Sequence, residues 1–371
     1  MEKPEKVLCI NGPNLDLLGR RSPDIYGTAT LEELEERVTE WGSRAGLEVT
    51  CRQSNHEGEL VEWVHAGTGY DGVVLNGGAL THYSWALADA VSSIATPVVE
   101  VHLSNIRSRQ RWRRRSLLTP VVVASLFGRG AQGYRHALRH LVNRAAWPTE
   151  TARYGPHPDQ VVDLRRASPG ADAAVLIHGG FWLDSWGRDT VETWAVDLAR
   201  RGISSAAVEY RRFGSGGSPV ATRHDVTEAV RLARQQLGVN QVAVIGHSAG
   251  ATLAVWHLLE GERRPTVTVG VSGLFDLAAG ASLGEGAPGR FDPEGSLDLM
   301  DQPLPDGRVV LVHGDADEVV PVGQSIAYRD RMVEKDGSVQ LECVHGQGHF
   351  DSLAADSPAW ELVLSALVGT G

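Results

Sequence analysis

Residues 10–27, INGPNLDLLGRRSPDIYG, follow the short apolar run VLCI at 7–10, which has the length and composition of a buried β-strand. Glycines and prolines interrupt this stretch, so we expect a loop that lasts until a helical pattern begins near residue 30. In the loop, Tyr26 stands five residues after Arg21. Tyrosine ionises at about pH 10 and becomes a useful base at neutral pH only where a fixed cation stabilises the phenolate. On these residues alone, an ordinary surface loop with an incidental arginine is the simpler interpretation.

Strand-like runs alternate with helical patterns along roughly the first 145 residues, which predicts a parallel sheet covered by helices. Polar residues follow several of the predicted strands: Asn14 and Arg21 follow the first, Asn76 another, and residues 100–105 a third. The carboxyl ends of parallel strands form the usual ligand-binding edge of such a sheet. This convergence therefore predicts a binding site rather than an ordinary surface.

Four more motifs occur in order after residues 10–27. They are QSNHEGEL at 53–60, LNGGALTH at 75–82, EVHLSN at 100–105 and the glycine-rich segment from Gly128 to Tyr134. Together these motifs closely resemble those of type II 3-dehydroquinate dehydratases, and several ordered motifs are far more specific than one. The resemblance implies a flavodoxin-like fold and dehydration of 3-dehydroquinate to 3-dehydroshikimate through an enolate.

Such a dehydration needs a base for the α proton, hydrogen bonds to the enolate oxygen and an acid for the departing hydroxyl. The resemblance implies that Tyr26, activated by Arg21, is the base and that His102 is the acid. The resemblance also implies that Glu100 orients the site, and alternation along the strand places Glu100 on the same face as His102. The other residues to which the resemblance gives roles are Asn14 as the anchor of a water that stabilises the enolate, and Asn76, His82, Ser104 and Arg113 as substrate-binding residues.

The resemblance also implies a homo-oligomer, in which a neighbouring subunit supplies Asp89 to the site and trimers assemble into a dodecamer. The sequence departs from the family pattern at several positions. Ala88 replaces the usual arginine before Asp89, which bears on the trimer contact, and Gly77 replaces a proline or alanine, which could loosen the loop of Asn76. Arg115 and Leu117 stand where histidine and tyrosine are common.

The polar, proline-containing residues 148–158 predict a linker between a first domain at 1–147 and a second at 159–371. In the second domain, the apolar run at 242–245 meets GHSAG at 246–250, and a helical pattern follows. A strand, a sharp turn and a helix around GxSxG predict the nucleophile elbow of an α/β-hydrolase.

We expect Ser248 to be the nucleophile, His349 its base and Asp317 the residue that orients the imidazole, in the chain order of α/β-hydrolases. Asp315 and His345 are nearby alternatives. The expected oxyanion-hole donors are the backbone N–H groups of Gly179, Gly180 and Ala249.

The motifs HGGFW at 178–182 and SGLFDL at 272–277 resemble those of the kynurenine-formamidase-like and carboxylesterase branch of α/β-hydrolases. This resemblance implies a small ester, thioester or amide substrate.

The composition limits the remaining classes of function. A length of 371 residues predicts two domains, and a net charge of −11 at pH 7 argues against general nucleic-acid binding, although residues 107–115 include six arginines. No apolar leader and no membrane-spanning run occurs, so we expect a cytoplasmic protein with small-molecule substrates and no membrane partner. No motif calls for a metal, nucleotide or redox cofactor.

Two hypotheses follow from the sequence. The first is a bifunctional enzyme with a dehydratase in front and a serine hydrolase behind. The alternative is a working serine hydrolase carried on a dehydroquinase-like oligomerisation scaffold whose catalysis has been altered. The presence of Arg21, Tyr26 and His102 favours the first hypothesis, whereas Ala88 and Gly77 leave room for the second.

Overall fold

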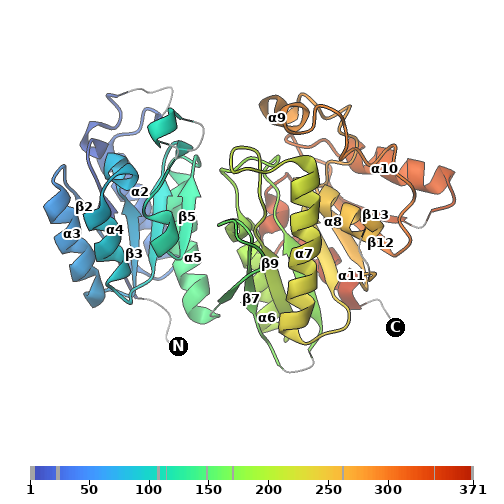
Figure 1. Ribbon diagram of the computed structural model, residues 1–371, viewed down its shortest axis with the longest axis horizontal. Helices are drawn as coiled ribbons and strands as arrows, with labels where there is room; N and C mark the ends of the chain where they lie inside the picture. Colours follow the sequence, from blue (N-terminus) through green and yellow to red (C-terminus); the bar gives the residue numbers. More distant parts are fainter. Residues whose placement is uncertain are drawn as a thin grey trace. The chain divides into compact units, whose positions relative to one another are not determined.

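The computed structural model describes residues 5–21, 26–106, 109–113, 115–147, 149–168, 171–260, 263–337 and 339–368, without the side chains of Arg111 and Glu285. Residues 22–25 of the opening motif, Arg107, Arg114 and Pro148 therefore lie outside the described part. Contacts between Cα atoms divide the chain into two compact units, Met1–Pro148 and Thr149–Gly371. Figure 1 shows one sheet with its own helices in each unit.

The first unit is a five-stranded parallel sheet with the strand order β2-β1-β3-β4-β5. This is the doubly wound order of flavodoxin-like folds, which confirms the predicted fold class. The strands are β1 (Lys6–Asn11), β2 (Glu48–Gln53), β3 (Gly72–Asn76), β4 (Val98–His102) and β5 (Ala124–Phe127). The α-helices are α2 (Leu31–Arg44), α3 (Glu57–Ala66), α4 (Trp85–Ser92) and α5 (Gln132–Ala146). Short 3₁₀ helices span Leu15–Leu17, Gly67–Gly69, Gly78–His82, Arg111–Arg113 and Thr119–Val121.

Two hydrophobic cores cover the two faces of this sheet. Helices α2 and α5 pack in one core, through residues such as Val38 and Leu138, and α3 and α4 pack in the other, through residues such as Leu60 and Leu87. Strand β3 is buried along its whole length, as expected for a parallel strand covered on both faces. The sheet therefore leaves its carboxyl edge as the place where loops can form a site.

The second unit is an eight-stranded sheet with the order β13-β12-β11-β10-β8-β9-β7-β6, parallel except where β7 pairs with β6 and β9. Its strands are β6 (Glu150–Arg153), β7 (Val161–Arg165), β8 (Ala173–Ile177), β9 (Ser204–Val208), β10 (Ala243–His247), β11 (Thr268–Val271), β12 (Val309–Gly314) and β13 (Val339–Val344). Its α-helices are α6 (Glu192–Arg200), α7 (Pro219–Leu237), α8 (Ala249–Glu260), α9 (Leu283–Phe291), α10 (Gly323–Glu334) and α11 (Pro358–Val368). Two 3₁₀ helices span Arg188–Val191 and Asp351–Leu353.

Helices cover both faces of the second sheet as well. Helices α7, α8 and α10 contribute to the larger core, and α6 and α11 contribute to the other, where Trp194 and Trp360 stack with ring centroids 4.9 Å apart. This is the architecture expected of an α/β-hydrolase. Among the residues that the structure describes, no helix has the length and apolar composition needed to cross a membrane.

Strand β6 occupies part of the segment 148–158, for which the sequence predicted a linker. It pairs antiparallel with β7 at the edge of the second sheet, and Thr151 Oγ1 donates a 2.6 Å hydrogen bond to Asp163. An edge strand is short and partly polar because one side meets solvent, so its composition is similar to that of a linker. The two prolines of this segment that the structure describes lie in the turn between β6 and β7.

Candidate active sites

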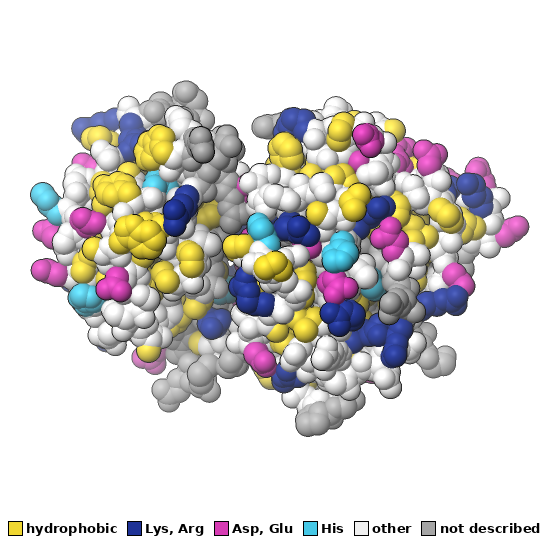
Figure 2. All heavy atoms as spheres, in the orientation of Figure 1, with side chains coloured by type: hydrophobic (Ala, Val, Ile, Leu, Met, Phe, Trp, Pro, Cys, Tyr) yellow, Lys and Arg dark blue, Asp and Glu magenta, His cyan; other side chains and the backbone are white. Residues whose placement is uncertain are grey.

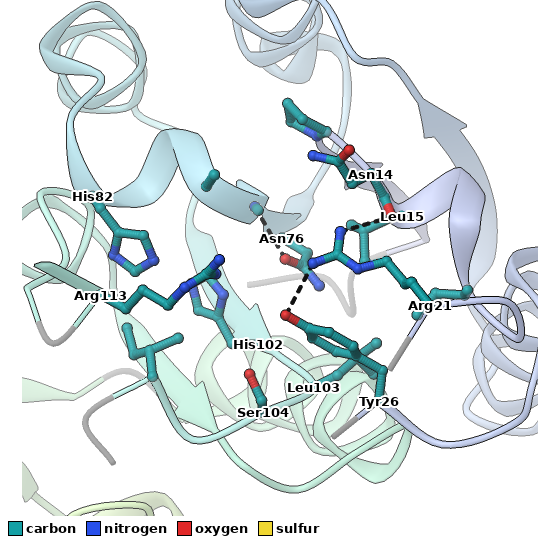
Figure 3. A pocket seen from close by; sticks show the side chains of 15 residues that line it. Asn14, Leu15, Arg21, Tyr26, Asn76, His82, His102, Leu103, Ser104 and Arg113 are labelled. Carbon is teal, nitrogen blue, oxygen red and sulfur yellow. Dashed lines mark hydrogen bonds between the residues drawn. The ribbon is translucent and has the colours of Figure 1, made fainter. Parts of the chain in front are cut away.

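A pocket in the first unit lies at the carboxyl ends of β1, β3 and β4. It brings together eight of the residues predicted from sequence: Asn14, Arg21, Tyr26, Asn76, His82, His102, Ser104 and Arg113. Figure 3 shows Arg21 and Tyr26 on one side of the pocket, His82, His102 and Arg113 on the other, and Asn76 between them. Glu100 lies behind His102, whereas Asp89 is exposed on α4 and does not line the pocket of its own chain.

The Tyr26 phenol contacts two guanidinium groups. Arg21 donates a 3.1 Å hydrogen bond to Tyr26 Oη, and Arg109 donates one of 3.4 Å. Burial alone would raise the pKa of Tyr26, but the Arg109 hydrogen bond and the charges of Arg21, Arg109 and Arg113 outweigh it, so the pKa is lowered. The site therefore favours the phenolate more than water does.

Sequence reasoning missed Arg109. Its guanidinium also donates a 3.2 Å hydrogen bond to Ser104 Oγ, so it joins the Tyr26 loop to the loop after β4. The available signal was the cluster of six arginines at 107–115, which suggested only a basic patch. Two described members of that cluster, Arg109 and Arg113, instead bring positive charge to Tyr26.

Asn14 has a left-handed backbone conformation, with φ of 66°. Its N–H donates a 2.7 Å hydrogen bond to Asn55 Oδ1, and Gln53 donates to both Asn55 Oδ1 and the Gly12 carbonyl. The motif at 53–60 therefore holds the loop after β1 from the neighbouring strand. The loop in turn holds Arg21, which donates a 3.2 Å hydrogen bond to the Asn14 carbonyl.

His102 is fixed by the buried carboxylate of Glu100, 3.0 Å from His102 Nε2. Burial would raise the pKa of Glu100, but hydrogen bonds from His102, Ser116 and Ser125 outweigh it and hold the pKa below its usual range. Because this carboxylate is ionised, His102 Nε2 carries a proton and donates. The Nδ1 atom of His102 is then left for the pocket.

His82 lies across from His102, with the ring centroids 6.3 Å apart. Its Nδ1 lies 2.7 Å from the Arg115 carbonyl oxygen, which can only accept, so Nδ1 is protonated. Burial lowers the pKa of His82, which favours the neutral ring with an accepting Nε2.

A chain of buried hydrogen bonds sets the orientation of Asn76. Asn76 Nδ2 donates to Tyr134 Oη at 2.8 Å, Tyr134 donates to Asn11 Oδ1 at 2.8 Å, and Asn11 donates to Glu35 at 3.0 Å. Burial raises the pKa of Tyr134 well above its usual value, so its hydroxyl remains a donor. With Asn76 Oδ1 also accepting from the Gly78 N–H at 3.2 Å, the amide cannot be inverted without losing both bonds.

Gly77 lies directly before the 3₁₀ helix Gly78–His82. Its φ of −68° is open to any residue, but a Cβ there would lie 2.6 Å from Thr81 Oγ1. Glycine at this position therefore provides space for Thr81. Ala88 is buried in α4 and packs in the core, so the position holds no charged side chain near Asp89.

In the second unit, Ser248 lies in the sharp turn between β10 and α8. Its φ is 55°, and its N–H donates a 2.8 Å hydrogen bond to the Val271 carbonyl. A Cβ on Gly246 would overlap the backbone of Gly250, and one on Gly250 would overlap the Ile177 carbonyl. The turn therefore has the strained, small-residue geometry of a nucleophile elbow.

His349 Nδ1 lies 2.7 Å from Asp317 Oδ2, and both residues are buried. Burial would raise the pKa of Asp317, but hydrogen bonds from His313 and His349 hold the pKa well below its usual range. The alternatives Asp315 and His345 form a separate, exposed pair, 2.9 Å apart. Within the described part of the chain, no hydrogen bond joins Ser248 Oγ to His349.

The loop after β8 lies against the nucleophile. A Cβ on Gly179 would lie 2.7 Å from the Cβ of Ser248, so only glycine allows this approach. Gly180 has a φ of 103°, which also favours glycine, and Ala249 follows Ser248 directly at the start of α8. The three predicted oxyanion-hole residues are thus in or beside the elbow.

A buried charged network that the sequence did not reveal supports this loop. Glu209 Oε1 lies 3.0 Å from His178 Nε2, and His178 Nδ1 lies 2.8 Å from the Gly179 carbonyl oxygen. Arg212 donates a hydrogen bond to Glu209, and Tyr210 stacks on His178 with centroids 4.4 Å apart. The signal that could have indicated it is the charged run VEYRR at 208–212, directly after a buried strand.

Comparison with known proteins agrees with the division of the chain into two units. Residues 5–142 match the family model of class II dehydroquinases, and residues 194–361 match that of the prolyl oligopeptidase family. The chain is 48% identical over 139 residues to a 3-dehydroquinate dehydratase of Halalkalibacterium halodurans, covering 37% of this chain and 96% of that protein. It is 50% identical over 137 residues to one of Thermus thermophilus, covering 36% and 92%.

Solved structures similar to the second unit include a truncated carbohydrate esterase from gut microbiota, with a TM-score of 0.53 and 16% identity over 61% of this chain and 97% of that one. Esterase B from Lactobacillus rhamnosis has a TM-score of 0.52 and 17% identity, covering 63% and 91%. At these identities the likeness shows the fold, so the resemblance to kynurenine formamidases stays a prediction. The second unit has an α/β-hydrolase fold, and through its first unit the chain belongs to the class II dehydroquinase family.

Proposed function

We propose a bifunctional enzyme, in which the first unit dehydrates 3-dehydroquinate to 3-dehydroshikimate and the second hydrolyses a small ester, thioester or amide. The observation that carries the first activity is a phenol held by two guanidiniums in one pocket with a carboxylate-bound imidazole. The first unit also spans nearly the full length of relatives named 3-dehydroquinate dehydratases. The second activity is supported by the elbow at Ser248, the buried Asp317–His349 pair and neighbours named esterases.

In the dehydration, Tyr26 as phenolate takes the α proton of the ketone onto Oη. The guanidiniums of Arg21 and Arg109 stabilise the phenolate before this step, and a water held by Asn14 hydrogen-bonds the enolate oxygen that forms. The enolate then expels the hydroxyl group, which leaves as water with the Nδ1 proton of His102 in its doubly protonated, imidazolium form. Glu100 holds Nε2 throughout and thereby keeps the acidic N–H directed into the pocket.

The altered-scaffold alternative is less favoured. Every residue to which we assign a step of the dehydration lies in the pocket or directly against it. The departures at Gly77 and Ala88 remove no group from the pocket, because Gly77 makes room for Thr81 and Ala88 packs in the core.

In the hydrolysis, Ser248 Oγ attacks the carbonyl carbon while His349 Nε2 takes the serine proton. The ionised carboxylate of Asp317 holds Nδ1–H and stabilises the imidazolium that forms. The N–H groups of Gly179, Gly180 and Ala249 would bind the oxyanion. His349 then gives its proton to the leaving group, and water releases the acyl group by the reverse sequence.

We further propose a homo-oligomer of trimers, assembled into a dodecamer, in which Asp89 completes the pocket of a neighbouring subunit. Asp89 is exposed on α4, and Tyr83 and Trp85 beside the start of this helix are 60% and 68% exposed. Figure 2 shows hydrophobic side chains gathered over this part of the first unit. Such a patch is typical of a surface that another protein covers.

The first prediction concerns the dehydratase. Purified protein should convert 3-dehydroquinate to the conjugated enone, measured as rising ultraviolet absorbance. Tyr26→Phe and His102→Ala should each lower kcat/KM by about 10²–10⁴-fold, because each removes a proton-transfer group. Tyr70→Phe, outside the pocket, serves as the matched control. Well-folded wild-type protein without turnover would contradict the assignment and favour the scaffold hypothesis.

The second prediction concerns Arg109. The rate rises with pH as Tyr26 loses its proton, and the Arg109 hydrogen bond and charge lower the pKa of Tyr26. Arg109→Ala should therefore raise this pKa and move the ascending limb of kcat/KM to higher pH. Arg20→Ala, which removes an exposed arginine of the loop after β1 that carries Tyr26, should leave the ascending limb in place. Equal profiles for wild type and Arg109→Ala would show that Arg109 does not act on the base.

The third prediction concerns the nucleophile. A fluorophosphonate probe should label Ser248, as located by peptide mass spectrometry, and labelling should disappear in Ser248→Ala but persist in the surface control Ser365→Ala. Dehydration of 3-dehydroquinate should continue in all three proteins, because the two proposed sites share no residue. Label on another serine, or a parallel loss of dehydration, would refute this separation.

The fourth prediction concerns assembly. If Asp89 acts in a neighbouring subunit, Asp89→Ala and Tyr26→Phe should each be weak alone but recover activity when mixed under subunit exchange. In a mixed oligomer, some Asp89→Ala subunits, whose own pocket is intact, lie beside a Tyr26→Phe subunit that supplies an intact Asp89. Light scattering should report a multiple of three chains for the wild type. A monomer, or a mixture no more active than its components, would rule out the proposed arrangement.

A further inference from the structure

Two aromatic side chains connect the oxyanion-hole loop of the hydrolase site to the segment that carries His349. Trp186 and Phe350 stack with ring centroids 5.7 Å apart and ring planes 12° apart. Trp186 belongs to the segment after the HGGFW loop, and Phe350 directly follows His349. The stacked pair therefore runs from the oxyanion-hole loop to the catalytic base.

Trp186 is held firmly at one end of this pair. A Cβ on Gly180 would overlap the Cβ of Trp186, so the tryptophan packs directly on an oxyanion-hole residue. The Trp186 carbonyl accepts a 2.7 Å hydrogen bond from Arg212, and its N–H donates to the Leu183 carbonyl at 3.3 Å. The ring is thus positioned by the same buried network that supports the loop.

Phe350 stands at the other end, against the base. Its ring is perpendicular to that of His349, with centroids 5.1 Å apart. The His349 carbonyl oxygen lies 3.0 Å from His247 Nε2 and accepts a 3.0 Å hydrogen bond from Ser352 Oγ, which fixes the backbone where Phe350 begins. Phe350 is nevertheless 51% exposed, so half of a well-positioned ring remains open.

The chemistry decides which part of a substrate meets this ring. In serine hydrolysis the histidine delivers its proton to the leaving group, so the leaving group must lie against His349. A group in that place also lies beside Phe350. Aromatic rings stack on one another with a gain of about 0.5–1.5 kcal/mol beyond burial.

We propose that Trp186 and Phe350 form the leaving-group wall of the second unit and that its substrates are esters of alcohols carrying an uncharged planar ring. This inference rests on the proposed hydrolase function. The exposed carboxylate of Asp351, next to Phe350, disfavours a negatively charged ring. Phe350 is a specificity-determining residue in this proposal, and Trp186 supports it.

The test compares benzyl acetate with methyl acetate, which share an acyl group and differ in the ring of the alcohol. Wild-type protein should have the higher kcat/KM for benzyl acetate, mainly through a lower KM. Phe350→Ala should lower the benzyl-to-methyl ratio about tenfold, as expected for loss of stacking together with buried area. Phe350→Leu should fall between, and Val220→Ala, at an exposed position of α7, should keep the wild-type ratio. A 4-carboxybenzyl ester should be a poorer substrate than the benzyl ester.

Labelling by diisopropyl fluorophosphate separates this inference from the function on which it rests. Absence of Ser248 labelling together with absence of ester turnover would overturn the hydrolase itself. Labelling of wild type and of both Phe350 variants shows that the elbow and base are intact in each. If Ser248 is labelled, an equal benzyl-to-methyl ratio of kcat/KM in wild type and Phe350→Ala would overturn the proposed role of Trp186 and Phe350. Labelling without turnover of either ester would overturn it as well.

Discussion

Burial of a carboxylate beside an imidazole is the interaction on which both sites depend. Three buried carboxylates among the described residues each lie within 3.0 Å of a histidine, and Asp317 also lies 3.2 Å from a second one, His313. The pairs are Glu100 with His102, Asp317 with His349, and Glu209 with His178. An ionised carboxylate removed from water costs several kcal/mol unless other donors replace the water. Each has such donors: three hydroxyls at Glu100, two backbone N–H groups at Asp317, and guanidinium groups at Glu209. Each carboxylate therefore fixes the orientation of its imidazole.

The Tyr26 site uses the opposite arrangement of charge. Here the group that must ionise is a phenol, and burial opposes its ionisation. Three arginines from two separate loops overcome this opposition, and their charges remain because guanidinium does not lose its proton. The Tyr26 pocket is accordingly polar and cationic, whereas the Ser248 elbow is buried and packs against the backbone of the loop after β8. These different surroundings suit a proton abstraction and an acyl transfer, respectively.

The sequence predicted the parts of the sites that occur in continuous motifs. Residues of the β1 loop and the elbow at Ser248 carry local patterns, because the sharp turns that present them need particular residues nearby. Arg109 has no such pattern, since it meets Tyr26 across 83 positions of the chain. The Asn76–Tyr134–Asn11 chain is equally non-local. Asp315 and Asp317 are two positions apart, and in the structure the Asp317–His349 pair is buried whereas the Asp315–His345 pair is exposed.

Backbone strain marks the same edges of the two sheets. Among the described residues, six that are not glycine have positive φ, and all but Asp336 follow a strand at a carboxyl edge: Asn14, Phe181, Trp182, Ser248 and Ser272. Such conformations cost about 1–3 kcal/mol each and persist only where the surroundings fix them. Neighbouring strands do so here, because the Ser248 N–H bonds the Val271 carbonyl and the Ser272 N–H bonds that of Val312. A parallel sheet whose core is buried on both faces can bear this cost at its edge, and catalytic geometry that is unfavourable in an isolated loop becomes the stable conformation.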